Sequence, residues 1–154
     1  SSHVKVGLTR KGNAKTRWID QGASSAVLLL EVKNRKAAGE VETHLKTVFS
    51  DRTHWQKMLK STTYMANELE AAKTKALSGL NEYLPSVHIP SVSEVVSIHY
   101  PVQNYPEKVK AFNLLKSPVI EDRLEGIKGQ YLIFSNGVLN IRKYQGHKIK
   151  LRVQ

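Results

Sequence analysis

The sequence predicts an α+β fold, and three observations support that prediction. Residues 4–8 alternate apolar side chains with polar residues or glycine, as in a half-buried strand. Between residues 64 and 84, apolar side chains recur at helical spacing. Toward the C-terminus, Asn136-Gly137 separates two apolar runs, which is the strongest short signal for a β-hairpin. We therefore expect an α/β core over residues 1–60, a helical connector and linker over 61–90, and a small antiparallel β module over 91–154.

The N-terminal core is expected to alternate strands and helices. Asn13 and Asn34 each precede a helical pattern, and asparagine is a favourable N-cap because its side-chain oxygen accepts from a free backbone N–H. Gly22 is placed to end the first helix, since glycine adopts positive φ at helix ends without strain. The apolar run between the two helices is too short for a typical helix and indicates a central strand. In chain order we expect strand 4–8, helix 14–21, strand 25–33 and helix 35–49.

The second helix of this core is predicted to be amphipathic. At helical spacing its apolar residues share one arc, made up of Ala38, Val41, Leu45, Val48 and Phe49. Glu42 lies at the flank of this arc, whereas Glu40 points the opposite way. A carboxylate at the edge of an apolar face costs free energy unless a cation or a hydrogen-bond donor meets it. We therefore expect Glu42 to have a partner.

Beyond the core, turn residues divide the chain into further short elements. We expect a short helix around Trp55, a helix over 64–84, an extended linker over 85–91, and strands over 95–100, 130–134, 138–144 and 147–153. In the last strand, Lys148, Lys150 and Arg152 face away from the apolar side chains. This basic face suits single-stranded nucleic acid. It is also typical of a solvated face, or of an edge strand that lysines protect against pairing with other chains.

The charge distribution favours a polyanionic partner. The 154 residues carry a formal net charge of +11. Residues 1–60 hold 12 Lys and Arg against 5 Asp and Glu, residues 104–154 hold 10 against 4, and residues 61–103 hold 2 against 4. Two basic ends around a mildly acidic middle suit a nucleic acid, DNA or RNA, contacted at two places. Basic charge alone is weak evidence, because many domains are basic for solubility.

Composition excludes several classes of protein. The chain has no cysteine, so it can build neither a disulfide nor a thiolate zinc site. It has no apolar run of about 18 residues and no signal-peptide pattern, so we expect a soluble, cytoplasmic protein without a membrane span. Because the chain begins at Ser1 without a methionine, we expect further residues upstream, including any cysteines.

Three stretches of the sequence resemble a bacterial family, the domain of unknown function 2797. They are Lys5-Val6-Gly7-Leu8-Thr9-Arg10, Thr16-Arg17-Trp18-Ile19-Asp20-Gln21-Gly22-Ala23 and Gly126-Ile127-Lys128-Gly129-Gln130-Tyr131-Leu132. This resemblance covers nearly the whole chain. The family name carries no activity, so function has to be inferred from the residues.

The order strand, helix, strand, helix in residues 3–49 also resembles the core of GIY-YIG nucleases, including variants written Lys-hydrophobic-Gly-x-Thr. In such nucleases a helix arginine contacts the scissile phosphate, a helix glutamate holds a divalent metal, and tyrosines help to activate water. The resemblance implies these catalytic roles for Arg17, for Glu42 as the ligand of Mg²⁺ or Mn²⁺, and for Lys5 at the position of a tyrosine. The first tyrosine motif of these enzymes would precede Ser1.

The chemistry of these residues favours binding more than cleavage. A guanidinium such as that of Arg17 grips phosphate oxygens bidentately, and one carboxylate with waters and substrate oxygens is a common Mg²⁺ arrangement. Lysine in place of tyrosine binds phosphate, but at neutral pH it is a poor base unless desolvated. Gln21, one turn after Arg17, could orient a phosphate or bond to backbone. For Arg17 and Glu42, the alternative is a structural ion pair between the two helices.

Two hypotheses about function follow. The first is a nucleic-acid-binding protein, with metal-dependent phosphodiester cleavage as an option and contacts from Lys5, Arg10, Arg17, Gln21, Lys148, Lys150 and Arg152. The alternative is a non-catalytic structural or adaptor module that retains the fold and binds a protein partner through its C-terminal sheet. Trp18 and Trp55 are more typical of core or domain contacts than of base-stacking platforms.

Overall fold

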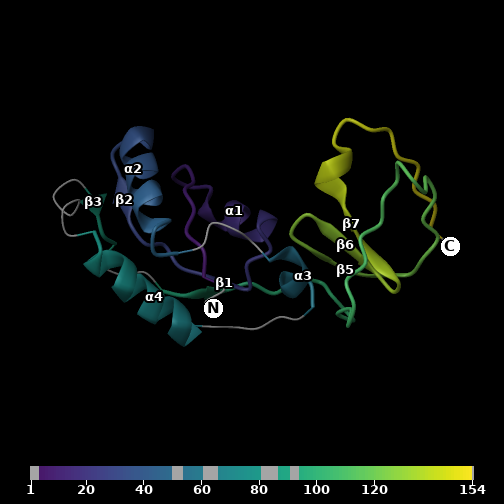
Figure 1. Cartoon of the computed structure of the whole chain (residues 1–154), viewed down its shortest axis with the longest axis horizontal. Coiled ribbons are helices and arrows are strands. Elements are labelled where there is room, and N and C mark those ends of the chain that lie inside the picture. Colours follow the sequence, from purple (N-terminus) through teal and green to yellow (C-terminus); the bar gives the residue numbers. More distant parts are fainter. Residues whose placement is uncertain (1–3, 50–53, 61–65, 81–86, 91–93, 154) are drawn as a thin grey trace.

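A computed structural model describes residues 4–49, 54–60, 66–80, 87–90 and 94–153, which combine short helices with small antiparallel sheets (Figure 1). The elements are α1 (Ala14–Asp20), β1 (Ser25–Ala26), β2 (Glu31–Val32), α2 (Arg35–Leu45), α3 (Trp55–Met58), α4 (Ala66–Ser78), β3 (Val87–His88), β4 (Val96–Ser97), β5 (Leu124–Lys128), β6 (Tyr131–Phe134), β7 (Gly137–Asn140) and the 3₁₀ helix η2 (Ile141–Tyr144). The predicted α+β class is confirmed. Within the described ranges, no helix has the length and apolar character needed to cross a membrane.

Helix α1 confirms the first predicted helix and ends in a Schellman motif. Gly22 has φ of +70°, and the amides of Gly22 and Ala23 donate to the carbonyls of Ile19 and Trp18 at 2.9 and 3.1 Å. At the other end, the side chain of Asn13 makes no capping hydrogen bond. The prediction of an Asn13 cap is wrong, because the backbone at Asn13 has φ −101° and ψ 8° rather than the extended conformation that N-caps usually have.

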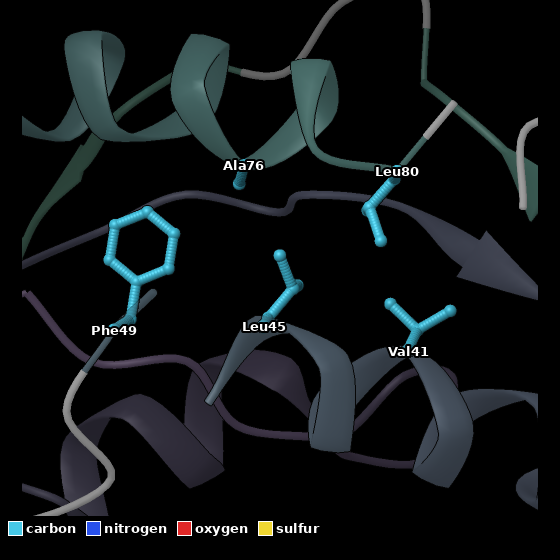
Figure 2. Close-up of a cluster of buried hydrophobic side chains, with 5 residues drawn as sticks. All are labelled: Val41, Leu45, Phe49, Ala76 and Leu80. Atoms are coloured by element: carbon cyan, nitrogen blue, oxygen red, sulfur yellow. The ribbon is translucent and has the colours of Figure 1, made fainter. Parts of the chain in front are cut away.

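Helix α2 carries the apolar face of the N-terminal region. Asn34 caps it as predicted, because its side-chain oxygen accepts from the Ala37 amide at 3.0 Å. Figure 2 shows the buried cluster that this face forms with α4 and the turn after it: Val41, Leu45, Phe49, Ala76 and Leu80. Val48, predicted to share this face, is 41% exposed. The helix ends at Leu45 and continues in turns, so Val48 no longer follows the helical period.

The two strands predicted in the N-terminal region are not formed as expected. Instead of one central strand over 25–33, β1 and β2 are separate two-residue strands in different sheets. Residues 4–8 form no strand and only a bridge at Lys5, although Val4 and Val6 pack against the α2 cluster. Apolar alternation therefore predicted correctly which side chains point inward, but it could not supply the neighbouring strands that a long ladder requires.

Strands β1 and β2 pair with distant segments of the chain. Ser25 and Ala26 pair with Ser97 and Val96 of β4, and Glu31 and Val32 pair with His88 and Val87 of β3. Both partners belong to segments that the sequence places after residue 60, in the predicted linker and β module. The boundaries at 61–90 and 91–154 remain predictions, but these pairings tie the three predicted parts together.

The C-terminal sheet confirms the predicted hairpin. Strands β5, β6 and β7 are antiparallel neighbours in that order, and the pairing of Phe134 with Gly137 leaves Ser135 and Asn136 as the loop. The Asp122 carboxylate accepts from the Asn136 amide and side chain at 2.9 and 3.1 Å, which holds the turn in place. The second strand ends four residues earlier than predicted, because residues 141–144 turn into η2.

The last predicted strand is absent from the described residues. Residues 147–153 have no strand assignment, and Ile149, Leu151 and Val153 are 55%, 82% and 88% exposed. Lys148, Lys150 and Arg152 are exposed as well, so the segment is not divided into a buried face and a solvated face. A period-two pattern becomes a strand only where another strand accepts its hydrogen bonds.

Candidate functional site

Three of the residues predicted to contact phosphate are associated with α1. The Lys5 Nζ donates to the Gln21 Oε1 at 2.6 Å, which joins the N-terminal segment to the end of the helix. Arg17 is exposed and lies four residues before Gln21, so both side chains share one helix face. We call Lys5, Arg17 and Gln21 the α1 surface.

Arg10 lies before the opposite end of the helix. Its carbonyl accepts from the Asn13 amide at 3.1 Å in the turn that leads into α1, and its side chain is exposed. Residues 4–21 contain five Lys and Arg and a single acidic residue, Asp20. Lys11 in the same stretch pairs with Glu31 at 3.2 Å, and both side chains are solvent-accessible. The stretch therefore presents excess positive charge to solvent.

Glu42 has the partner that its position on α2 predicts. The Lys46 Nζ lies 3.6 Å from its Oε2, one turn along the same helix, and the Glu42 side chain is 23% exposed. Between the described parts of α1 and α2, no ion pair joins Arg17 to Glu42, so the structure does not form the alternative interhelical pair. In the ranges the structure describes, no group of three or more His, Cys, Asp or Glu side chains is arranged to hold a metal ion.

The second set of predicted contacts lies elsewhere in the molecule. Lys148, Lys150 and Arg152 are exposed on the C-terminal segment, beyond the three-stranded sheet and at the opposite end of the molecule from α2 (Figure 1). The structure therefore brings Lys5, Arg17 and Gln21 together and leaves the C-terminal basic residues apart from them.

Sequence reasoning missed a buried lysine in the C-terminal sheet. Lys128 is 0% exposed, and its Nζ lies 5.4 Å from the ring centre of Tyr100 and 5.3 Å from that of Tyr105. The Ser24 hydroxyl accepts from the same ammonium at 3.3 Å. Burial lowers the pKa of Lys128 to about 8. Lysines are rarely buried, so the Gly126-Ile127-Lys128-Gly129 motif alone did not indicate this environment.

Tyr100 connects the buried lysine to α1. Its hydroxyl lies 3.0 Å from the Ala23 carbonyl, 3.2 Å from that of Ile19 and 3.5 Å from that of Trp18. A phenol has one hydrogen, and the Ile19 and Trp18 carbonyls already accept from the amides of the Schellman motif. The hydroxyl therefore donates mainly to Ala23. Burial, and then electrostatic interaction with Tyr105 and Asp20, raise the pKa of Tyr100 to about 12, so the donor keeps its proton.

Two other groups that could have been functional are used in packing. The Trp55 ring stacks on Tyr131 with centroids 5.6 Å apart and planes 3° apart, so it joins α3 to β6. The Glu125 side chain accepts from Asn104 at 2.6 Å and from Ser135 at 2.9 Å, and these hydrogen bonds lower its pKa. The stacking of Trp55 on Tyr131 confirms the predicted contact role of Trp55.

Comparison with known proteins gives a family for nearly the whole chain. The profile of the family described as "Protein of unknown function (DUF2797)" matches residues 1–149. No curated protein and no solved structure matches the sequence. The matched region contains α1, the buried lysine and the whole three-stranded sheet. The chain therefore belongs to the DUF2797 family.

Proposed function

We propose that this protein binds nucleic acid through the α1 surface, with Arg10 at its edge. The observation that carries the proposal is the contact of Lys5 with Gln21, which adds a cation to the helix face that presents Arg17. The five basic residues of positions 4–21 supply the charge that a phosphate backbone attracts. Arginine and glutamine at adjacent turns offer the forked donors and the amide that bind phosphate oxygens.

In its finer form, the proposal makes the N-terminal region a GIY-YIG-like core with a divalent ion at Glu42. Glu42 would supply one carboxylate ligand to Mg²⁺ or Mn²⁺, and phosphate oxygens and waters would supply the rest. Displacement of Lys46 from Glu42 would have to accompany metal binding, because the two groups lie 3.6 Å apart. Lys5 would grip the phosphate, with Gln21 orienting its ammonium.

The binding proposal is tested by titrating labelled single- and double-stranded DNA and RNA at several salt concentrations. Wild type should bind with an affinity that falls steeply with salt, because neutralised phosphates release counterions. Arg17→Ala should weaken binding about 5- to 10-fold at low salt and reduce the slope of log K against log salt by about 1.

A matched control separates contact from net charge. Lys36→Ala removes the same charge from an exposed α2 side chain that pairs with Glu40 at 3.9 Å. It should leave the affinity within about 2-fold of wild type, because Lys36 lies on α2 outside the proposed interface and the loss of its exposed pair costs little stability. Equal losses in both variants, or no binding of any nucleic acid at low salt, would contradict an interface at α1.

The cleavage option is tested by incubating the bound nucleic acid with and without Mg²⁺ or Mn²⁺. Glu42→Gln should abolish metal-dependent cleavage while preserving binding, since it removes the ligand charge but keeps the side-chain shape. Glu40→Gln is the control, because Glu40 is on the same helix but exposed. Cleavage that survives Glu42→Gln would rule out this metal ligand and leave the binding proposal intact.

One observation favours a second candidate, the non-catalytic adaptor. Exposed apolar side chains occur in the C-terminal part of the chain, namely Leu115, Val119, Leu151 and Val153 at 76%, 76%, 82% and 88% exposure. Exposed apolar groups that form a contiguous patch are typical of protein contact surfaces. If this candidate is correct, a partner protein retained by wild type at high salt should be lost from a Leu151→Ser variant in an affinity purification.

A further inference from the structure

Helix α1 is too short to hold its position alone. It has seven residues, and none of them is buried. Isolated helices shorter than about 12 residues are marginal in water, and most helical stability in proteins comes from packing of an apolar face. Contacts at the ends of α1 must therefore supply much of what fixes its orientation.

The end of α1 is enclosed by backbone and side chains from other elements. A Cβ built at Gly22 would lie 2.3 Å from the Met58 Sδ, and one built at Gly129 would lie 3.0 Å from the Gly22 nitrogen and 3.1 Å from the Asp20 carbonyl oxygen. Gly129 forms the turn between β5 and β6. The C-terminal sheet thus touches the end of α1 through the backbone itself.

Tyr100 and Lys128 add a polar connection at the same place. The Tyr100 hydroxyl donates to the Ala23 carbonyl at 3.0 Å, immediately after the Schellman motif. The Tyr100 ring is in turn held by the Lys128 ammonium, 5.4 Å from its centre. Lys128 belongs to β5 and pairs with Tyr131 of β6, so the connection begins in the three-stranded sheet.

We propose that Tyr100 and Lys128 are positioning residues for nucleic-acid binding: they hold the end of α1 against the C-terminal sheet and thereby orient Arg17 and Gln21. This inference rests on the proposed function of the α1 surface. Neither residue contacts the nucleic acid. Lys128 is fully buried, and the Tyr100 hydroxyl is turned toward carbonyls at the end of α1 and just after it.

The test uses Tyr100→Phe, which removes the hydroxyl but keeps the ring beside Lys128. Tyr144→Phe is the matched control, because the buried Tyr144 also uses its hydroxyl in the fold, accepting from the Leu114 amide at 2.9 Å, far from α1 in the sequence. Amide hydrogen exchange is measured at Gly22 and Ala23, whose hydrogen bonds close the helix end. Nucleic-acid affinity is measured on the same samples.

Tyr100→Phe should speed exchange at Gly22 and Ala23 and weaken nucleic-acid binding about 5- to 10-fold, the scale of one hydrogen bond to a buried group. Tyr144→Phe should change neither the exchange at Gly22 and Ala23 nor the nucleic-acid affinity. In the Arg17→Ala background the effect of Tyr100→Phe on affinity should shrink, because the residue being positioned is gone. If Tyr100→Phe acted only by destabilising the fold, its loss of affinity would add to that of Arg17→Ala.

Several results would overturn the inference. Faster exchange with unchanged affinity would show that Tyr100 holds the helix without positioning the ligand contacts. Equal losses of affinity in the two tyrosine variants, or additivity with Arg17→Ala, would reduce the effect to general destabilisation. If wild type binds no nucleic acid, the proposed function fails and the positioning role fails with it. The exchange data then still report whether Tyr100 holds α1, so the two failures are distinguishable.

Discussion

The N-terminal region and the C-terminal sheet use β-structure in opposite ways. In the C-terminal sheet, β5, β6 and β7 follow one another in the sequence and pair over four or five residues each. In the N-terminal region, β1 and β2 have two residues each and pair with β4 and β3, which lie far along the chain. One region is built from local hairpins, and the other depends on segments that must come together from a distance.

This difference shows which contacts hold each region in its folded arrangement. The hairpins can form from neighbouring residues, whereas β1, β2 and α1 are short and obtain their partners from the second half of the chain. Tyr100, Lys128 and Gly129 are among these partners. The candidate phosphate contacts on α1 therefore depend on a sheet that contributes none of them.

The largest expected effect comes from truncating a buried side chain in either hydrophobic core. Leu45→Ala in the N-terminal cluster and Ile133→Ala in the sheet each remove a side chain that is at most 1% exposed. Each should lower the free energy of unfolding by about 2–5 kcal/mol. Because β1–β4 pairing and the Tyr100 contacts connect the regions, urea titrations followed by circular dichroism should show one transition in both variants. Two separable transitions, each shifted by only one variant, would show that the N-terminal region does not depend on the C-terminal sheet for its stability.

A second test changes the pH. The folded-state pKa of Lys128, about 8, lies below the 10.5 of an ordinary lysine because of burial. Below pH 8 both states keep the proton, and between pH 8 and 10.5 the folded state releases it first, so the free energy of unfolding rises with pH in this window. The gain should reach about 2–3 kcal/mol near pH 10.

Lys128→Met isolates this contribution from the other titrating groups. Urea titrations at pH 7.5 and 10 should show a smaller increase in stability for the variant than for wild type. Tyr100 and Tyr105, whose rings lie against the Lys128 ammonium, remain present in both proteins. Identical pH profiles for the two proteins would show that Lys128 titrates normally and is not held in this environment.

A glycine pair sharpens the comparison at the junction of the two regions. Gly129 and Gly12 have φ of +57° and +85°, so alanine is strained at both. Only at Gly129 would the new Cβ press on another backbone, that of Gly22, whereas Gly12 faces open space. Thermal unfolding should show Gly129→Ala costing about 2 kcal/mol and Gly12→Ala about 1. Equal costs would mean that the sheet does not press on the end of α1.

The smallest effect compares two asparagines that look equivalent in the sequence. Asn34→Ala should destabilise the protein by about 1 kcal/mol, because the side chain accepts from the Ala37 amide. Asn13→Ala should cost little, since the Asn13 side chain forms no such bond. Chemical denaturation measures both. A larger loss at Asn13 would indicate a cap in solution at the start of α1.

Much of the local structure could be predicted from the residues. Apolar periodicity predicted the face of α2, Asn13 and Gly22 marked the two ends of α1, and Asn136-Gly137 marked the hairpin. The strands predicted at residues 4–8, 25–33 and 147–153 did not form as expected, because a strand needs hydrogen-bonding neighbours that its own residues do not specify. Of the candidate site, the shared helix face of Arg17 and Gln21 and the need of Glu42 for a partner followed from helix geometry.

By itself, the sequence determined the fold class, the basic charge, the amphipathic face of α2 and the position of the hairpin. These properties follow from backbone preferences and side-chain periods of a few residues. Only the tertiary structure decided the two-residue strands, the contact of Lys5 with Gln21 and the burial of Lys128 between two tyrosines. Each of these joins residues distant in the chain, and the free energy of such contacts depends on the final packing rather than on local sequence.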